Sequence, residues 1–389
     1  MNEGVHARLR LGARAGTILV LSSLLALAAV ACGDDDVGGG SDEPAPQADA
    51  GGPVEGKLTV SQWPLYIDKG DGNTLDEFEQ QTGVEVEWIE DINDNQQFFG
   101  KLQPLLERGE AGERSLITVS DWLAAQMYDL GYLQKLDYSK LPNVEENLIP
   151  ALSSPAADPE REFTVPWQSG MTGLIVRTDV APEVDSICDL FDPKYKGRVT
   201  MLTEMRDSVP MTLKCMGIDP DEATEEEWLD AVAKIDEAAD SGQIRRFTGN
   251  DYIEDLRSGN VDFVLGWSGD AVLLQADDPN IEFVMPAEGC MLWSTSMEIP
   301  VGAPNVAAAE AWINYVYDPE VQADIAEYVN YVTPVAGVKE ILAKRDPELA
   351  RNQLIFPSEE YTKDCTFEPV LDGPLGQKVT DAFSDAVGG

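Results

Sequence analysis

Residues 58–89 read LTVSQWPLYIDKGDGNTLDEFEQQTGVEVEWI, and the order of local patterns in this stretch decides the fold. Leu58 to Trp63 alternates in the manner of a β-strand. Thr74 to Gln81 has the periodicity of a helix, which Gly83 ends, and Val84 to Ile89 is strand-like again. A strand, a helix and a second strand at this spacing predict a unit with parallel strands.

The alternation of helix and strand continues along the chain. Asp94 can cap a second helix, and Leu116 to Val119 is expected to form a third strand. Trp122 to Leu130 has the pattern of a third helix, which Asp121 is expected to cap. These elements predict an α/β fold with a mostly parallel, doubly wound sheet. Ligands of such sheets bind beyond the carboxyl ends of the strands.

A second set of elements follows Trp167. A helix is expected from Thr224 to Ala239, and strands are expected near Gly173–Val176, Val199–Leu202, Val261–Leu265 and Ile281–Val284. The roughly 330 residues after the N-terminal segment exceed the usual size of one hydrophobic core. We therefore predict two α/β lobes that face each other across a ligand cleft.

The N-terminal segment indicates export. Arg8, Arg10 and Arg14 precede a weakly polar to apolar run that ends at Ala31 and is followed by Cys32. We interpret residues 1–32 as a lipoprotein signal with a lipidated Cys32. An ordinarily cleaved, free secreted protein is the alternative. Residues 33–56 are rich in Asp, Gly, Ala and Pro and predict a flexible linker. The protein is thus expected in the periplasm or at the outer face of the cytoplasmic membrane, with the lipid anchor as its only membrane contact.

Charge and histidine content exclude several functions. Removal of the signal takes away three Arg and one Glu, which leaves 24 basic and 70 acidic residues and a net charge of −46. Such a surface repels nucleic acid and favours cations, although solubility or adaptation to salt also explains it. The one histidine, His6, lies in the signal, so His-dependent catalysis and His-ligated zinc are excluded. We predict no catalytic residue, cofactor or metal.

Four cysteines follow the signal, an even number in an exported chain. Two disulfides are predicted, and four buried free thiols are the alternative. Three pairings are possible, of which we favour Cys188 with Cys215 and Cys290 with Cys365.

Aromatic and acidic residues gather at the predicted strand ends. An alkyl diammonium ion fits this combination, because its methylenes lie between rings and each ammonium needs a carboxylate. Core packing is the alternative for each tryptophan, and solvent exposure is the alternative for Glu204. The residues are Trp63, Tyr66, Trp122, Trp267, Trp293, Asp121, Glu204, Asp207 and Asp270.

Several ordered stretches resemble the spermidine/putrescine-binding proteins of bacterial ABC importers. The resemblance runs from about Leu58 to near Pro369 and implies the two-lobed periplasmic-binding-protein type II fold. We expect one lobe over 57–170 and 297–338, and the other over 171–296 and 339–389. The stretches are Trp63-Pro64-Leu65-Tyr66, Leu133-Gln134-Lys135-Leu136-Asp137, Phe191-Asp192-Pro193-Lys194-Tyr195-Lys196-Gly197, Gly266-Trp267-Ser268-Gly269-Asp270, Trp293 to Pro300, Asp318-Pro319-Glu320 and Tyr331-Val332-Thr333-Pro334.

The resemblance also implies roles for individual residues. Trp63 and Tyr66 would line the cleft, and Ser120 would hydrogen-bond an amine. Asp207 would meet one end of the ligand, and Trp267 with Asp270 would hold the other amine. Trp293 and Tyr331 would complete the aromatic lining. Together with Trp122 and Thr295, these residues make up the predicted ligand-binding set: Trp63, Tyr66, Ser120, Trp122, Asp207, Trp267, Asp270, Trp293, Thr295 and Tyr331.

Two positions depart from the family pattern, since Leu65 and Thr295 stand where the family has acids. An unpaired buried ammonium costs several kcal/mol, so tight binding of an ordinary triamine is not expected. A shorter diamine, a guanidino amine such as agmatine, or a cation with one charged end fits better.

The predicted function is capture of a small cationic amine (putrescine, agmatine or spermidine) for delivery to an ABC permease, by a monomer without catalytic activity. One alternative is ferric iron held by Tyr328 and Tyr331, which lie three residues apart and could share a helix face. Another is a carboxylate-dependent hydrolase that uses Asp207 and Asp270. A surface sensor for the same solute is a third.

Overall fold

The computed structural model describes residues 54–155, 158–369, 371 and 373–388. The predicted signal with Cys32, and linker residues 33–53, lie outside these residues. Among the described helices, none combines the length and the apolar character that a bilayer crossing requires.

The described strands form one sheet in the order β2-β1-β3-β9-β4-β7-β5-β6, with β10 paired to β9 and β8 paired to β4. Pairing is parallel within β2-β1-β3 and within β7-β5-β6, which we call the first and second half-sheets. The strands are β1 (Lys57–Gln62), β2 (Glu85–Glu90), β3 (Leu116–Ser120), β4 (Thr164–Arg177), β5 (Val199–Leu202), β6 (Ile244–Thr248), β7 (Phe263–Trp267), β8 (Ile281–Val284), β9 (Met291–Glu298) and β10 (Thr366–Phe367).

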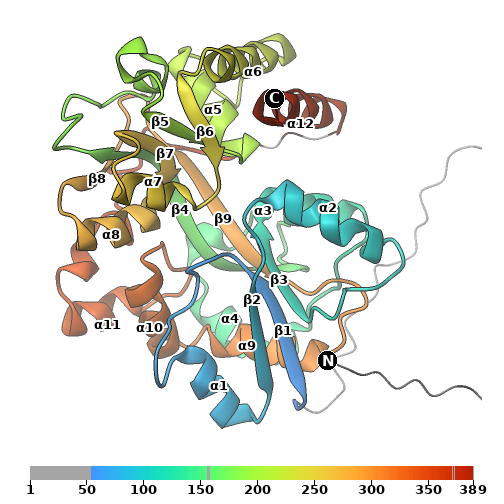
Figure 1. Cartoon of the computed structure of the whole chain (residues 1–389). Coiled ribbons are helices and arrows are strands. Elements are labelled where there is room, and N and C mark those ends of the chain that lie inside the picture. Colours follow the sequence, from blue (N-terminus) through green and yellow to red (C-terminus); the bar gives the residue numbers. More distant parts are fainter. Residues whose placement is uncertain (1–53, 156–157, 370, 372, 389) are drawn as a thin grey trace, which may run out of the picture. The chain divides into compact units, whose positions relative to one another are not determined.

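Helices cover both half-sheets, as Figure 1 shows. Helix α12 packs on α6 and α6 on α5, whereas α10 packs on α11 and contacts α1. The helices are α1 (Thr74–Thr82), α2 (Asn95–Leu106), α3 (Asp121–Asp129), α4 (Pro142–Asn147), α5 (Met205–Cys215), α6 (Glu225–Asp240), α7 (Tyr252–Arg257), α8 (Ser268–Asp277), α9 (Val306–Tyr315), α10 (Pro319–Val329), α11 (Val338–Arg345) and α12 (Gly373–Gly388).

Local sequence signals explain most helix ends. The Asp94 carboxylate caps α2 by accepting from the Gln97 amide, as predicted. Thr224 and Glu227 form a reciprocal capping box at the start of α6. The predicted cap at Asp121 is wrong, because α3 begins one residue earlier and Ser120 occupies the N-cap position. Asp121 instead accepts a hydrogen bond from Ser296 of β9.

Strands β4 and β9 join the two half-sheets (Figure 1). They pair antiparallel with each other over Thr164–Thr172 of β4. Strand β9 also pairs antiparallel with β3, and β4 pairs antiparallel with β7. The parallel order predicted from the sequence therefore describes the half-sheets, and an antiparallel centre connects them.

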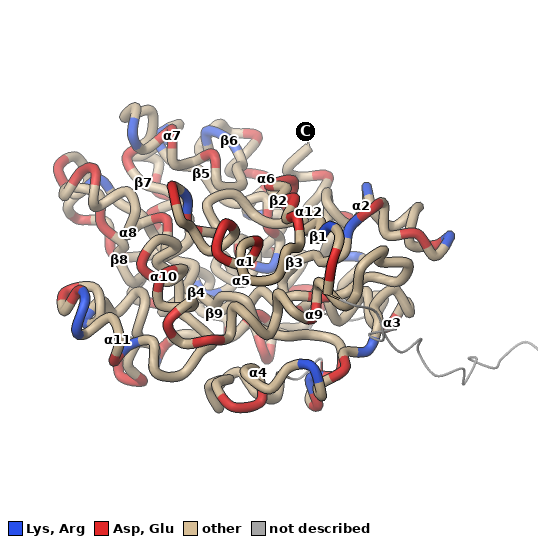
Figure 2. Tube along the Cα trace, turned by 90° about the horizontal axis from the view of Figure 1, so that it is seen from below, with Lys and Arg blue, Asp and Glu red and all other residues tan. Residues whose placement is uncertain are grey.

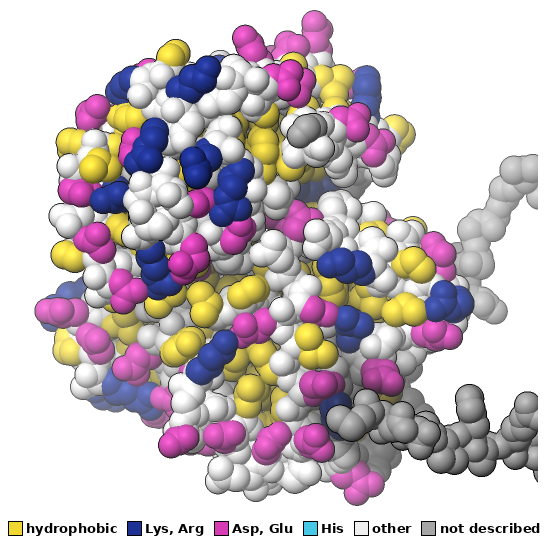
Figure 3. All heavy atoms as spheres, viewed as in Figure 1, with side chains coloured by type: hydrophobic (Ala, Val, Ile, Leu, Met, Phe, Trp, Pro, Cys, Tyr) yellow, Lys and Arg dark blue, Asp and Glu magenta, His cyan; other side chains and the backbone are white. Residues whose placement is uncertain are grey.

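Acidic residues are spread over helices and loops (Figure 2). Lys and Arg gather on the face in Figure 3 over β6 and α7. Ion pairs offset this local positive charge, since Arg246 pairs with Asp251 and Asp255 and Arg257 pairs with Asp277. Because these pairs are partly exposed, each is worth at most about 1 kcal/mol.

The favoured disulfide pairing is confirmed. Cys188 bonds to Cys215 with a Cα–Cα distance of 5.0 Å, and Cys290 bonds to Cys365 with a Cα–Cα distance of 4.4 Å. The first disulfide ties the C-terminal end of α5 to the short 3-10 helix Ile187–Phe191, and the second joins the residues directly before β9 and β10.

Loss of either disulfide should destabilise the fold, and the loss of unfolding free energy should be larger for the disulfide whose cysteines lie further apart in the sequence. Replacing Cys188 and Cys215 by Ser opens a loop of 27 residues and should lower the unfolding free energy by about 3.5 kcal/mol. Replacing Cys290 and Cys365 opens a loop of 75 residues and should lower it by about 4.5 kcal/mol. Guanidinium titrations of the two double variants measure both values. A larger loss for the shorter loop would contradict this reasoning.

Candidate functional site

A cavity lies where the carboxyl ends of β1, β3, β5 and β7 meet. Its empty volume is about 390 Å³, including open solvent at its mouth. Eight of the ten predicted ligand-binding residues line it, and Trp122 and Asp270 do not. The described lining residues are Trp63, Tyr66, Asn95, Ser120, Glu204, Asp207, Asn250, Trp267, Trp293, Thr295, Tyr331 and Glu368.

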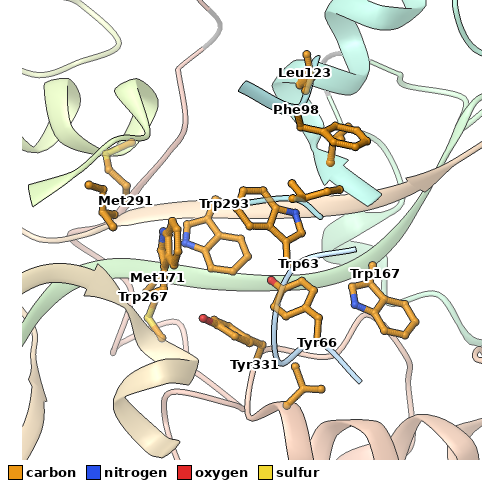
Figure 4. Packing of buried hydrophobic residues seen from close by; sticks show 14 of the residues in the cluster. Trp63, Tyr66, Phe98, Leu123, Trp167, Met171, Trp267, Met291, Trp293 and Tyr331 are labelled. Carbon is orange, nitrogen blue, oxygen red and sulfur yellow. The ribbon is translucent and has the colours of Figure 1, made fainter. Parts of the chain in front are cut away.

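The turn after β1 supplies the first wall. Pro64 fixes the turn, and Leu65 adopts a φ of 62°, in the left-handed region that normally favours glycine. The Trp63 indole Nε1 donates to the Thr118 carbonyl of β3 at 3.1 Å, which fixes the ring against the sheet. Figure 4 shows the rings of Trp63 and Tyr66 near those of the other cavity aromatics, with Trp167 further away. Leu65, at the position where the resemblance expects an acid, therefore occupies the left-handed position of this turn and does not line the cavity.

Aromatic rings from distant segments meet around the cavity (Figure 4). The ring centroids of Trp63 and Trp267 are 6.1 Å apart at an interplanar angle of 78°. Tyr331 makes edge-on contacts with Tyr66 and with Trp293, each at 5.3 Å. Edge-to-face contacts at such distances are favourable beyond simple burial. The predicted gathering of these rings is thus present, and whether they bind a ligand stays a prediction.

Glycine makes room for one of these rings. Gly170 of β4 lies directly opposite Trp293 of β9 in the antiparallel register. A Cβ atom at position 170 would lie 2.4 Å from the Trp293 ring, far inside van der Waals contact. Thr295, two residues beyond Trp293, also lines the cavity, and its hydroxyl donates to the Gln168 carbonyl at 3.2 Å. The β4–β9 register therefore fixes this wall.

Asp207 is a buried carboxylate in the first turn of α5. Its Oδ1 accepts from the Thr172 hydroxyl at 2.5 Å and its Oδ2 accepts from the Trp267 indole at 3.1 Å. Burial raises the pKa of Asp207 to about 6, although these two hydrogen bonds favour the anion. The side chain is 3% exposed, so a charge here needs a compensating partner.

Glu204 connects the two halves of the molecule across the cavity. Its Oε1 accepts from the Asn95 amide at 2.7 Å and from the Asn95 side chain at 3.1 Å. Asn95 in turn donates to the Ser120 hydroxyl at 2.9 Å. Burial, and then the nearby charge of Asp94, raise the pKa of Glu204 well above its usual range. The alternative of a solvated loop charge for Glu204 is therefore wrong.

Sequence reasoning missed three lining residues and left Glu204 out of the predicted set. Asn95 follows the correctly predicted cap Asp94, so it could have been found at the start of that helix. Asn250 follows β6, a strand that was not predicted. Glu368 follows the two-residue strand β10, which is too short to give a periodic pattern.

Asp270 lies one layer behind the cavity lining. Its Oδ2 accepts from the Tyr252 hydroxyl at 2.6 Å and from the Asn250 side chain at 3.0 Å. Its Oδ1 accepts from the Tyr331 hydroxyl at 3.1 Å. Burial raises the pKa of Asp270, and the three donors partly offset that effect. The carboxylate thus holds Asn250 and Tyr331, which do line the cavity.

Trp122 also lies outside this cavity. It lines a neighbouring cavity of about 1050 Å³, including open solvent, where its ring lies 4.7 Å from the guanidinium carbon of Arg206. This contact is a cation–π interaction within the protein. Trp293 and Glu368 border both cavities and separate them.

The tyrosine pair of the ferric-iron alternative does not form. Helix α10 ends at Val329, and Asn330 caps it in the left-handed conformation, so Tyr328 and Tyr331 do not share a helix face. Tyr328 is exposed, whereas Tyr331 is buried. Burial and the Asp270 charge raise the pKa of Tyr331 well above its usual value, which opposes formation of a tyrosinate ligand. Within the described part of the chain, no group of His, Cys, Asp or Glu has the arrangement of a metal site.

Comparison with known proteins identifies the class. A family model for the bacterial extracellular solute-binding proteins matches residues 73–356, which is more than half of the chain. The chain therefore belongs to the bacterial extracellular solute-binding proteins. Members of this class are exported substrate-binding components of ABC transporters. The predicted two-lobed type II fold is confirmed.

Individual relatives agree with the predicted resemblance. The spermidine/putrescine-binding periplasmic protein of Escherichia coli is 27% identical over 79% of this chain and 85% of its own length. The putrescine-binding periplasmic protein SpuD of Pseudomonas aeruginosa is 28% identical over 84% of this chain and 90% of its own. A solved Listeria monocytogenes ABC transporter protein named for spermidine and putrescine has a TM-score of 0.76 and 25% identity, covering 85% of this chain and 98% of its own.

Gly170→Ala should push the Trp293 ring out of its position, because the new methyl group overlaps the ring. The expected cost is about 1 to 3 kcal/mol of unfolding free energy, with altered near-ultraviolet circular dichroism of the indoles. Gly100→Ala is the matched control, since nothing lies within 4 Å of its Cβ position in α2. Helix propensity predicts that the control is more stable by up to about 1 kcal/mol. Equal effects of the two changes would show that position 170 does not hold Trp293.

Proposed function

We propose that this chain is the substrate-binding component of an ABC importer, which captures a small cationic amine and delivers it to a membrane permease. The observation that carries the proposal is the composition of the cavity. Three tryptophans and three carboxylates line it, and its described lining residues include no Lys or Arg. Cation–π contacts and charged hydrogen bonds are what a desolvated ammonium requires.

The cavity also supports a short ligand. The part of this cavity that the centre of a water-sized sphere can reach is only about 30 Å³, so the arrangement has room for a compact ligand and not for an extended one. Neither Leu65 in the turn after β1 nor Thr295 of β9 brings an acid to the cavity. Putrescine, agmatine or another compact amine is therefore favoured over an extended triamine. The names of the relatives, which include putrescine and spermidine, support the same class.

The finer parts of the proposal follow from the sequence. The exported chain is lipid-anchored through Cys32 at the outer face of the cytoplasmic membrane or in the periplasm, and it acts as a monomer without catalysis. Its lobes comprise 57–170 with 297–338, and 171–296 with 339–389. Closure of the lobes around the ligand follows when the ligand contacts both of them. The hydrolase alternative uses Asp207 and Asp270 as its acid pair, but Asp270 does not line the cavity and its carboxylate accepts hydrogen bonds from Asn250, Tyr252 and Tyr331, so this pair does not face one substrate.

A calorimetric panel of putrescine, agmatine, spermidine, cationic amino acids and ferric iron tests the function. At least one amine should bind, and Asp207→Asn should weaken that binding by about 1.5 to 3 kcal/mol. The amide can still accept from Trp267 and donate to the Thr172 hydroxyl, so the cavity wall is retained. Asp230→Asn, an exposed change of the same charge on α6, is the control and should bind normally. Binding of iron alone, or of no amine, would refute the proposal.

Amine affinity should fall at low pH. Because burial raises the pKa of Asp207 to about 6, this carboxyl takes up a proton as pH falls through that value and loses its attraction for a cation. Below about pH 6, affinity should drop about tenfold per pH unit for each proton that the ligand displaces. Titrations in buffers of different ionisation enthalpy should show proton release on binding. Asp207→Asn should remove the part of this dependence near pH 6.

The stability of the empty protein should change with pH in the opposite direction. The folded pKa of about 6 exceeds the ordinary value of 3.8, so the folded state binds this proton more tightly than the unfolded chain does. The unfolding free energy should therefore decrease as pH rises from about 3.8 through about 6, by up to about 3 kcal/mol from this group. Thermal unfolding of wild type and of Asp207→Asn over this range separates the contribution. An unchanged pH slope in the variant would count against it.

A further inference from the structure

A carboxylate enters the cavity from the C-terminal segment. Glu368 follows β10 and lines the cavity beside Trp293. It is half-buried, and it stands on a different element from Leu65 and Thr295, the two positions where the resemblance expects acids. The cavity thus has a third acid that neither the sequence pattern nor the resemblance assigns.

The segment that carries Glu368 is held at both ends. The Cys290–Cys365 disulfide joins it to β9 at the residue before β10 begins. The Thr366 amide donates to the Cys290 carbonyl at 3.1 Å, and the Glu368 amide donates to the Leu292 carbonyl at 2.9 Å. Strands β9 and β10 pair in parallel. Cys290 precedes Trp293 by three residues and Cys365 precedes Glu368 by three residues, so the disulfide and the two cavity residues lie at matching positions along the two strands.

Arg206 fixes the other end of the segment. Its guanidinium donates to the Pro369 carbonyl at 2.8 Å and to the Leu371 carbonyl at 2.9 Å. The Arg206 side chain also lies on the Trp122 ring, so it is held between α3 and the C-terminal segment. Backbone anchors on both sides therefore restrict where the Glu368 carboxylate can lie.

The electrostatics of the cavity favour a cationic guest next to Glu368. Burial, followed by repulsion from Asp207, raises the pKa of Glu368 well above its usual range, and the Arg206 charge opposes this shift. Glu204 adds further repulsion. A positive group inside the cavity would replace repulsion among these carboxylates by attraction. The lining residues that the structure describes include no Lys or Arg, and the nearby Arg206 guanidinium lies outside the lining, where it donates to the Pro369 and Leu371 carbonyls.

We propose that Glu368 is a specificity-determining anion for the amine, and that the Cys290–Cys365 disulfide sets amine affinity by holding the segment that carries it. This inference rests on the proposed function, because it assumes that the ligand is a cationic amine. Glu368 supplies from the C-terminal segment negative charge that Leu65 and Thr295 do not supply. The ligand class is then an amine whose positive charge lies against the Asp207, Glu204 and Glu368 side of the cavity.

The first test removes the charge. Glu368→Gln keeps the shape of the side chain and should weaken binding of the best amine of the panel about tenfold to a hundredfold, as expected for a lost charged hydrogen bond. Glu359→Gln is the matched control, because Glu359 is an exposed residue of the same C-terminal segment. It should bind the amine with wild-type affinity. Equal affinities of the Glu368 and Glu359 variants would overturn the role of Glu368.

The second test releases the segment. Replacing Cys290 and Cys365 by Ser should weaken amine binding about tenfold, whereas replacing Cys188 and Cys215 should leave it within about twofold of wild type. Both double variants are measured at a temperature where circular dichroism shows them folded. In the Glu368→Gln background, loss of Cys290 and Cys365 should cause little further weakening, because the two changes act on the same contact. Equal weakening by both disulfide losses, or full additivity with Glu368→Gln, would overturn the role of the disulfide.

The outcomes separate this inference from the proposed function. If wild type binds no amine, both fail. If wild type binds an amine and Asp207→Asn loses it, but Glu368→Gln does not, the function stands and the inference about Glu368 is overturned.

Discussion

Strands β4 and β9 run antiparallel through the centre of the sheet, and their register positions the parts of the site. Gly170 faces Trp293 in that register, so an indole fits where any side chain would exclude it. Thr172, two residues further along β4, holds the Asp207 carboxylate. A shift of the register by one residue would turn these side chains to the opposite face of the sheet. The cavity therefore depends on the register of the β4–β9 ladder.

The contacts that join the two halves border the same cavity. Glu204 accepts two hydrogen bonds from Asn95, and Asp270 accepts one from Tyr331. Burial of such carboxylates is unfavourable without compensation, so these groups lower the stability of the protein without ligand. In the proposed function, a cationic ligand that contacts both halves would offset this cost and would favour a closed arrangement of the lobes over an open one. Binding and closure would then depend on the same desolvated groups.

Short-range patterns predicted the strands of the half-sheets other than β6, because parallel strands alternate with helices at regular spacing. Strand β9 escaped detection, since it is buried almost throughout and has no period of two. At the site, Asp207 and Asp270 have the same sequence signal, an acid in the first turn of a helix after a strand. Only tertiary packing distinguishes them, because Tyr252 and Tyr331 donate hydrogen bonds to Asp270. Thr172 and Trp267 instead donate to Asp207. Glu368 reaches the cavity through a disulfide and two ladder bonds, which no local pattern encodes.

The lining residues divide by charge between the two sides of the cavity. The lining residues on the side of the first half-sheet are uncharged; they are Trp63, Tyr66, Asn95 and Ser120. All the described lining carboxylates come from the second side and the C-terminal segment; they are Glu204, Asp207 and Glu368. Coulomb attraction acts over a longer range than ring contact, so in the proposed function the exposed acidic residues of the surface steer the first encounter with a cation. The buried carboxylates and the rings act once the ligand is inside, and their loss alters mainly the rate of release. Changes of surface charge instead alter the rate of capture and its salt dependence.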